Sequence, residues 1–313
     1  MVATVEQPDL ANLEPGIYPG MSFADYRKIK AVNASVLLWA RQTMRHLFAA
    51  LEGKLEQEDT DALGFGRALH TKLLEPDEFD RRYLIAQQCA AILMTGPNRG
   101  KQCQHEGRGM RDGNWFCGSH ADGAGIPEGA EVLSKSELAQ INAAADALKK
   151  HPAESLRKCR GEFEVVVVGD LMGVRCKARI DKLIRSPLTI VDPKKVAAAS
   201  SPHTKFSGSE LNFTGLLGSL GYGLKAAFQC DLIQAVLGQQ PRFFWIAVED
   251  NYPYCAGAYQ ASNVALAAGR NEYRTYLSQL KAAQDSGEWP GYTTDVVMID
   301  GPNWWLQQWK GLD

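Results

Sequence analysis

The chain has 313 residues, of which 45% are hydrophobic, so it can bury a large core. Its formal net charge is -2, which excludes a global positive field that attracts nucleic acid, and any DNA-binding surface must therefore be local. No apolar run approaches the length of a membrane span, and the N-terminus lacks the basic and apolar regions of a signal peptide, so we expect a cytoplasmic protein.

The domain organisation follows from changes in composition. No linker rich in Pro, Gly and Ser separates two halves, which favours one large α/β domain with a small insertion. We predict a flexible N-terminal arm over residues 1–16, a main domain over 17–86 and 124–313, and an insertion over 87–123. The seven Cys residues of an intracellular chain favour metal binding over disulfides.

Two helices are predicted before the insertion. Asn33 is a plausible N-cap for a helix that runs through Leu37, Leu38 and Met44. Residues 60–74 have the apolar spacing of a second helix, with His70 close to its apolar side. A His in such a place is either a packed core residue or a metal ligand.

The insertion gathers glycine, basic residues, Cys and His. Cys89, Cys103, Cys117 and His120 are spaced x13, x13 and x2, and a Cys-x-x-His knuckle lets two ligands grip one ion, so we predict a zinc site. Zinc would supply folding energy that a long loop lacks. The alternatives are free thiols in a flexible loop, His105 in place of His120, or an iron-sulfur cluster, which normally takes a fourth Cys. The basic residues either touch DNA or are solubilising charges; the candidates for contact are Arg99 and Lys101.

Strands follow a helix over residues 132–150, which Ser134 and Glu137 start as a capping box. The β-branched run at 165–168 precedes Gly169-Asp170 and Gly173, a pattern typical of a hairpin, and further strands are predicted at 174–184 and 188–191. A turn at 185–187 would bring Asp181 beside Asp192 by antiparallel pairing.

Chemistry is indicated at the ends of these strands. Two adjacent carboxylates repel unless a divalent ion neutralises them, and Lys194 shares a strand face with Asp192. Metal, carboxylates and an ammonium group suit phosphodiester hydrolysis. The alternative is a solvated ion pair at a strand end.

The C-terminal third is predicted to hold helices and two strands. A helix at 213–237 carries Tyr222, Lys225 and Gln229, and Lys225 is either a phosphate contact or a solvated charge. Strands are expected within 242–259 and a long helix at 263–286. Clustered Trp residues near the C-terminus are expected to cover the core or form a subunit contact.

In one order along the chain, these motifs resemble the PD-(D/E)XK nuclease superfamily, in particular the phage and prophage RecE-type (exonuclease VIII-like) exonucleases. The matching residues are Gly66-Arg67-Ala68-Leu69-His70, Glu162, Arg179-Ile180-Asp181 and Asp192-Pro193-Lys194. The segment TKLLEPDEFDRRY and the later IAVEDNYPYCAGAY and GRNEYRTYLSQL also resemble the family. The resemblance runs from about Tyr18 to Tyr292, interrupted by the insertion.

The resemblance implies a restriction-endonuclease-like core, with a mixed central sheet flanked by helices, and a Mg²⁺-dependent deoxyribonuclease in which Mn²⁺ can substitute. Asp181 and Asp192 would bind the metal, His70 would complete or support the site, and the backbone carbonyl of Lys195 would add a ligand. Glu162 would help with a second metal, and Lys194 would assist the attacking water.

The activity that the resemblance implies is 5′-to-3′ digestion of linear duplex DNA in phage-type recombination. It also implies a homo-oligomer that cooperates with a single-strand annealing protein. The chain departs from the family at Pro193, where an apolar residue is usual, at Lys195, where Thr is usual, and at Lys225 and Gln229, where Gln and Tyr are usual. The rival hypotheses are a weakly active or non-catalytic DNA-binding protein, and an endonuclease or CRISPR-adaptation-type processing nuclease.

Overall fold

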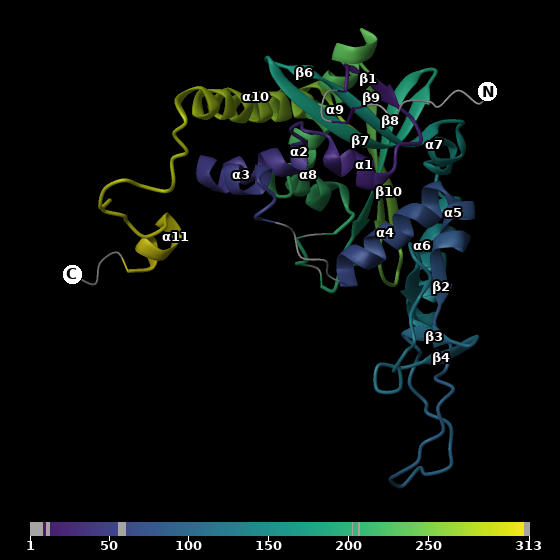
Figure 1. Ribbon diagram of the computed structural model, residues 1–313. Coiled ribbons are helices and arrows are strands. Elements are labelled where there is room, and N and C mark those ends of the chain that lie inside the picture. The colour runs from purple at the N-terminus through teal and green to yellow at the C-terminus, as the bar shows by residue number, and fades with distance from the viewer. Residues whose placement is uncertain (1–8, 11–12, 56–60, 202, 206, 310–313) are drawn as a thin grey trace.

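A computed structural model describes residues 9–10, 13–55, 61–201, 203–205 and 207–309 (Figure 1). Most of the predicted N-terminal arm, residues 1–8 and 11–12, lies outside these ranges. The end of that segment is packed, because Leu13 is 7% exposed and Gly16 begins strand β1 (Gly16–Tyr18). The expectation of a loose arm is therefore wrong for its last residues.

Within the described ranges, six strands form the central sheet in the order β1-β6-β7-β8-β9-β10. After β1 these are β6 (Glu162–Leu171), β7 (Val174–Arg185), β8 (Leu188–Val196), β9 (Arg242–Glu249) and β10 (Ala256–Gln260). Neighbouring strands are antiparallel except β8 and β9, which run parallel and therefore need a crossover. The predicted mixed sheet is confirmed.

The predicted hairpin forms, but its turn lies further along the chain. Gly169 and Asp170 remain in β6 and pair with β7. The turn residues are Met172 and Gly173, whose φ angles are 54° and 76°. Two successive positive φ angles give the turn that matches the twist of a two-residue hairpin.

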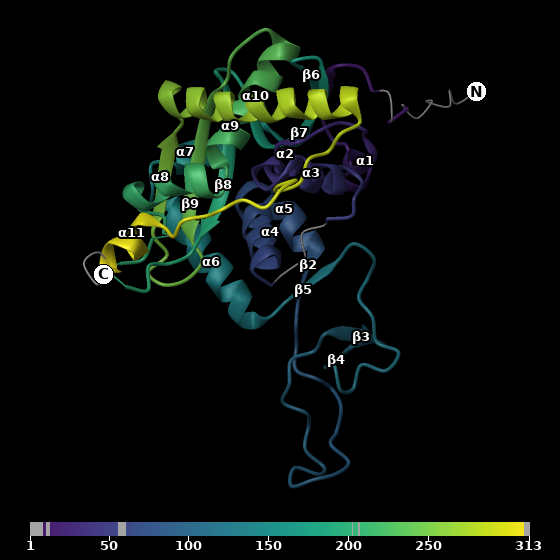
Figure 2. The ribbon, with the colours of Figure 1, turned by 90° about the vertical axis from the view of Figure 1, so that its left-hand side faces the viewer.

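Helices cover both faces of the sheet (Figures 1 and 2). Ile190 of β8 faces the core under α2 (Ala34–Leu37), α3 (Met44–Leu51), α9 (Tyr222–Leu237) and α10 (Asn263–Ser286). Val191 faces the core under α4 (Asp61–Leu74), α5 (Pro76–Arg82) and α6 (Lys135–Lys149). Because β8 is buried on both faces, its side chains are held rigidly.

Two predicted helices are interrupted. The helix expected through Leu37 and Met44 is divided into α2 and α3 by a 3₁₀ helix (Leu38–Arg41). Thr43 is the N-cap of α3. The one expected over 213–237 divides into α8 (Glu210–Ser219) and α9 at Gly221. Gly221 has φ of 70°, and a Cβ there would lie 2.6 Å from Leu38, so glycine fits both the turn and the contact.

Other predicted elements are confirmed. Ser134 and Glu137 form both hydrogen bonds of the capping box that starts α6, and α10 has the predicted bounds. Shorter elements complete the chain: α1 (Phe23–Lys28), β2 (Tyr83–Ile85), β3 (Gly109–Arg111), β4 (Asn114–Phe116), β5 (Glu131–Leu133), α7 (Glu154–Lys158) and α11 (Asn303–Leu306). No described helix is both long enough and apolar enough to cross a membrane.

Two segments project from this body (Figures 1 and 2). One is the insertion, which carries β3 and β4. The other is the chain after α10, which leads to α11. Trp289 packs on Phe48 at a ring distance of 4.5 Å, but Trp304, Trp305 and Trp309 are 68%, 48% and 58% exposed. Core cover by these last Trp residues is therefore wrong, and a subunit contact stays a prediction.

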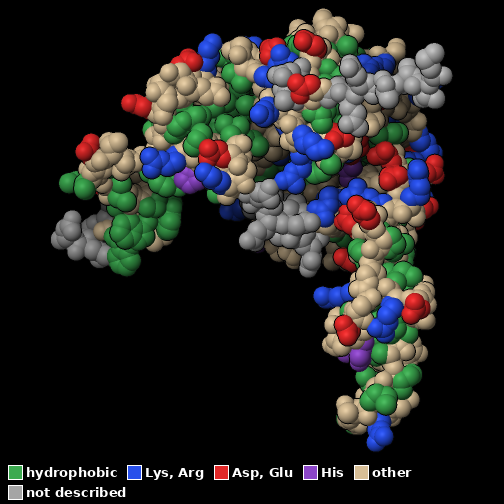
Figure 3. All heavy atoms as spheres, viewed as in Figure 1, with side chains coloured by type: hydrophobic (Ala, Val, Ile, Leu, Met, Phe, Trp, Pro, Cys, Tyr) green, Lys and Arg blue, Asp and Glu red, His purple; other side chains and the backbone are tan. Residues whose placement is uncertain are grey.

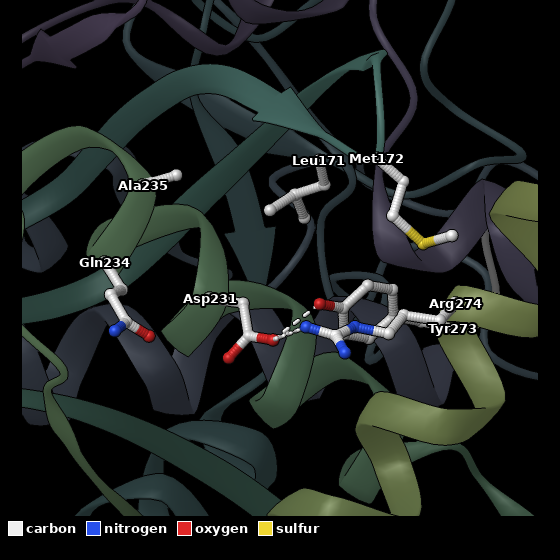
Figure 4. Close-up of a pocket in the computed structure, with 7 residues that line it drawn as sticks. All are labelled: Leu171, Met172, Asp231, Gln234, Ala235, Tyr273 and Arg274. Atoms are coloured by element: carbon white, nitrogen blue, oxygen red, sulfur yellow. Dashed lines mark hydrogen bonds and ion pairs between the residues drawn. The ribbon is translucent and has the colours of Figure 1, made fainter.

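A hollow of about 220 Å³ lies between α9, α10 and the β6–β7 turn (Figure 4). Asp231 is buried there, and its carboxylate accepts hydrogen bonds from Arg270, at 2.6 Å, and from Tyr273, at 2.5 Å. A buried carboxylate that is fully paired ties the two helices together. We assign this hollow a structural role.

Candidate active site and Cys/His centre

A group of polar side chains meets where α4 crosses the sheet. Leu69 and Leu73 bury the apolar side of α4, and His70, between them, turns toward β6 and β7. His70 Nε2 lies 3.1 Å from Asp181 Oδ2, and His70 Nδ1 lies 3.6 Å from Glu164 Oε1. The imidazole therefore bridges carboxylates from two strands, as a ligand or an orienting partner does.

The two predicted carboxylates are side by side. The antiparallel register of β7 and β8 places Lys182 opposite Val191. One residue further along, the same register places Asp181 opposite Asp192. Their carboxylates are close enough for each to shift the pKa of the other. Asp192 is 6% exposed, so its charge must be neutralised by a proton or a cation.

Lys194 supplies one such cation. Its Nζ donates a hydrogen bond to Asp192 and lies 5.2 Å from the ring centre of Tyr222. Lys225, one helical turn after Tyr222 on α9, is close enough to Lys194 for their charges to interact. Burial and the charge of Lys194 lower the pKa of Lys225, so the site places two amines beside its carboxylates.

The structure brings to the cluster a different acidic residue of β6 from the one that the sequence predicted. Glu162 does not join the cluster: its carboxylate pairs with Arg185, at 2.6 Å, near the far end of β7. Glu164 takes its place and pairs with Arg179, at 2.9 Å. The register puts Phe163 opposite Lys182 and so carries Glu164 to the level of Asp181.

Glu164 has φ of 52°, a left-handed conformation that is costly for a residue with a side chain. Such strain is typical of functional positions. Sequence reasoning missed Glu164 because Glu162 and Glu164 lie two residues apart on one strand. Strand periodicity puts both on the same face, and only the pairing register with β7 separates them.

Pro193 and Lys195 flank Lys194 without disturbing it. The paired stretch of β7 and β8 ends at Val191, so Pro193, which has no N–H, lies beyond it. On the other side β8 continues beside β9, with Pro193 opposite Ile246. The side chain of Lys195 pairs with Asp250 at 2.9 Å, away from the cluster. Its carbonyl as a metal ligand stays a prediction.

Electrostatics of the cluster follow from three carboxylates in little water. Burial raises the pKa of Asp192 to about 7, with the charge of Asp181 adding to the effect and Lys194 opposing it. Burial and Asp181 likewise raise the pKa of Glu164 to about 7. Burial opposes ionisation of Asp181, but His70 and Lys194 hold its pKa below the usual range. Burial also disfavours the imidazolium, yet the carboxylates raise the pKa of His70 to about 9.

These residues fit a hard divalent cation. Atoms of His70, Glu164 and Asp181 lie within 4.8 Å of one another, and the register of β7 and β8 puts Asp192 beside Asp181. His70 Nε2 is buried and makes no hydrogen bond of good geometry, so it is available to a ligand. Carboxylate oxygens suit Mg²⁺, and an added imidazole is acceptable to Mn²⁺. A cation would replace the protons that otherwise hold the carboxylates together.

The insertion brings its four predicted ligands together. The sulfur atoms of Cys89, Cys103 and Cys117 and a nitrogen of His120 all lie within 4.8 Å of one another. His120 Nδ1 is 3.3 Å from Cys117 Sγ and 3.5 Å from Cys89 Sγ. His105 lies 3.3 Å from Cys103, so the alternative fourth ligand is also close. Three thiols and an imidazole are the donor set that Zn²⁺ takes in structural sites.

The remaining DNA-contact candidates lie in different places. Arg99 and Lys101 are exposed in the insertion, where Lys101 Nζ is 3.5 Å from the side chain of Asn98. Gln229 lies one turn beyond Lys225 on α9 and is half-buried. The structure therefore brings Tyr222 and Lys225, but not Arg99 and Lys101, to the cluster.

The fold and the cluster define a PD-(D/E)XK-like protein. Residues 33–301 match the model of the family described as PDDEXK-like domain of unknown function (DUF3799), and the chain belongs to that family. This confirms the superfamily part of the resemblance and the predicted fold. The RecE-type part stays a prediction.

One similar solved structure is a protein of Eubacterium rectale described as a "Putative exonuclease". The TM-score is 0.57 at 14% sequence identity, over 93% of this chain and 98% of that chain, which supports the fold alone. A second, SSO0001, has a TM-score of 0.26 at 12% identity, over 45% of this chain and 60% of that chain. No curated protein matches this chain.

Proposed function

We propose that this protein is a metal-dependent deoxyribonuclease that hydrolyses phosphodiester bonds of linear double-stranded DNA. The single observation that carries the proposal is the convergence of His70, Glu164 and Asp181, whose ligand atoms lie within 4.8 Å of one another. Asp192, with the amine of Lys194 on it, lies beside Asp181 by the register of β7 and β8. When bound, Mg²⁺ or Mn²⁺ would lower the pKa of a water and neutralise charge on a phosphate.

The residues of the chain have separate tasks in this proposal. Asp181 and Asp192 hold the cation, and His70 orients Asp181 or adds a nitrogen ligand. Glu164, held by Arg179, takes the role that the resemblance suggested for Glu162. Lys194 steadies the attacking water or the charge that develops on the phosphate.

Lys225 and Tyr222 form the wall of the site on α9. An amine at Lys225 suits a phosphate oxygen as a point charge, where the family usually has Gln. Because burial and Lys194 disfavour its charge, a bound phosphate would compensate both amines. The departures at Pro193 and Lys225 thus leave the cluster assembled, which favours the enzyme over a non-catalytic binding protein.

We further propose the RecE-type activity: exonucleolytic, 5′ to 3′, and part of phage-type recombination. The order of the motifs along the chain supports this more than any distance does. The nuclease domain would comprise residues 17–86 and 124–313, and residues 87–123 would form an insertion held by structural Zn²⁺. Arg99 and Lys101 on that insertion would contact the DNA backbone.

The exposed C-terminal segment supports the proposal of a homo-oligomer and of contact with a single-strand annealing protein. Val296, Met298 and Ile299 are 103%, 95% and 85% exposed, and the exposed Trp side chains of α11 follow them. An apolar segment of this kind is typical of an interface. Light scattering of the full chain and of a chain ending at Tyr292 measures the first point; equal masses would contradict it.

The test of the activity uses a fluorescent linear duplex and a closed circular duplex of the same sequence, with Mg²⁺ or Mn²⁺. The proposal expects digestion of the linear DNA alone, release of mononucleotides from the 5′ end, and loss of digestion in Asp192→Asn. Cutting of the circle would favour an endonuclease. Tight binding without digestion would favour the non-catalytic protein.

A further inference from the structure

An exposed aromatic side chain stands next to the candidate active site. Phe23, the first residue of α1, is 54% exposed. The guanidinium carbon of Arg179 lies 5.1 Å from the centre of its ring, and Arg179 also pairs with Glu164 at 2.9 Å. Phe23 is therefore only two side chains away from the group that would hold the metal.

The ring of Phe23 is held in place. It stacks on Tyr26, with centroids 6.1 Å apart and planes inclined by 24°. Tyr26 in turn lies under the amine of Lys177, at 4.7 Å. Lys177 is 5% exposed and donates hydrogen bonds to the carbonyls of Tyr26, at 2.9 Å, and Ile29, at 2.7 Å, which fixes the end of α1.

The surroundings of Phe23 are basic although the chain as a whole is not. Arg27, Lys28 and Lys30 are exposed on or just after α1, with Asp25 as the acidic partner of Lys28. Lys and Arg side chains gather over α1 and α4 on the face shown in Figure 3. A flat apolar ring bordered by cations matches an unpaired base that is joined to backbone phosphates.

We infer that Phe23 is a stacking platform for a base of the strand that enters the active site. This inference rests on the proposed nuclease function and names a positioning residue for it. One isolated exposed Phe has no special meaning. This ring differs because Arg179 and Tyr26 both contact it while more than half of it stays exposed, and because Arg179 links it to Glu164.

The first measurement is kinetic. Phe23→Ala should raise KM for linear duplex DNA by about tenfold, since base stacking on an aromatic residue has that order of effect. The kcat should stay within about twofold, because stacking is the same before and in the transition state. Phe23→Trp should keep the wild-type KM. Phe23→Leu, which retains apolar volume without a π face, should behave as Phe23→Ala.

The second measurement is spectroscopic. In an Asp192→Asn background, which prevents digestion, 2-aminopurine placed near the end of the strand should be quenched on binding when Phe23 is present. It should stay bright with Phe23→Ala. Leu237→Ala is the matched control: Leu237 is 40% exposed at the end of α9, beside the start of β9 and away from the cluster.

The outcomes separate the two proposals. A wild-type protein that digests DNA while Phe23→Ala and Phe23→Leu keep its KM and its quenching overturns the stacking role alone. A Phe23→Trp variant as impaired as Phe23→Ala also overturns it, because the ring would then be needed only for packing. A wild-type protein that neither binds nor digests DNA overturns the proposed function and this inference together.

Discussion

The cluster around Asp192 and the Cys/His centre differ in what holds their ligands in place. His70, Asp181 and Asp192 come from a helix and two strands buried on both faces of the sheet. The four ligands of the insertion come from one short stretch with a small apolar cluster of its own. The first group is assembled by the core whether or not a cation is bound. The second group is held by that small cluster and by backbone hydrogen bonds of the loop, so a bound metal would contribute much of its stability.

In the first site, packing of the core holds carboxylates together although their charges repel. In the second site, a bound metal and the packing around it would favour the same arrangement. In the cluster the packed core holds the carboxylates close together, and this arrangement favours tight binding of a hard cation. In the insertion a bound metal would replace the missing core. Removing metal from the cluster around Asp192 should therefore abolish activity, whereas removing it from the Cys/His centre should unfold the insertion.

The largest effect is expected at Lys194. Lys194→Gln should lower kcat by about 10³-fold, because it removes a charge that acts on the reacting phosphate or water. The measurement is the single-turnover rate with a linear duplex and saturating Mn²⁺. Lys195→Gln is the matched control, since Lys195 pairs with Asp250 and its carbonyl is unchanged by substitution. Equal losses in both variants would contradict the role of Lys194.

The next effect distinguishes Glu164 from Glu162. Glu164→Gln should weaken metal affinity or activity by about 10–100-fold, as loss of a ligand or of its orienting partner does. Glu162→Gln should stay within about twofold, because it breaks only a half-exposed pair with Arg185. Metal titrations followed by activity give both values. The reverse ranking would restore the sequence-based choice of Glu162.

A structural effect is expected in the insertion. Purified protein should contain one zinc per chain by mass spectrometry and be colourless, and Cys117→Ser should lose that zinc. Hydrogen exchange should then rise over residues 87–123, while the strands of the main sheet stay protected. Cys159→Ser serves as the control, since Cys159 is exposed and outside the cluster. Loss of protection in the sheet would show that the insertion also supports the core.

The smallest effect is a pH dependence of stability without divalent ions. Glu164 and Asp192 have pKa values of about 7 in the folded protein, above those of free side chains, which are about 4. The folded state therefore holds more protons between pH 4 and 7, so stability falls as pH rises through that range. His70 adds stability that is complete below pH 6.5 and is lost as pH rises through about 9.

Thermal melting with EDTA should thus decline from pH 5 to pH 8, and Mn²⁺ should restore more at pH 8 than at pH 5, because binding requires deprotonated ligands. Asp192→Asn should flatten the decline. A melting temperature that rises over this interval in EDTA would contradict the crowding of the carboxylates.

Local residue patterns in the sequence determined several secondary-structure elements and two pairs of candidate ligands. The β-branched run at 165–168 and the turn residues between the apolar runs that follow it predicted three strands, and the capping box predicted the start of α6. The spacing of Cys117 and His120 predicted a pair of ligands in one turn, because neighbours in a knuckle are close whatever the rest of the chain does. The antiparallel meeting of Asp181 and Asp192 followed from a short turn.

Only the tertiary structure decided which residues join across elements. Glu162 and Glu164 are equivalent by strand period, and the register with β7 selects Glu164. The break at Gly221 depends on the approach of Leu38, which lies far away in the chain. Phe23 and Arg179 are in contact although about half of the chain separates them in the sequence. Such contacts are set by how buried faces pack on one another, and local residue patterns do not encode them.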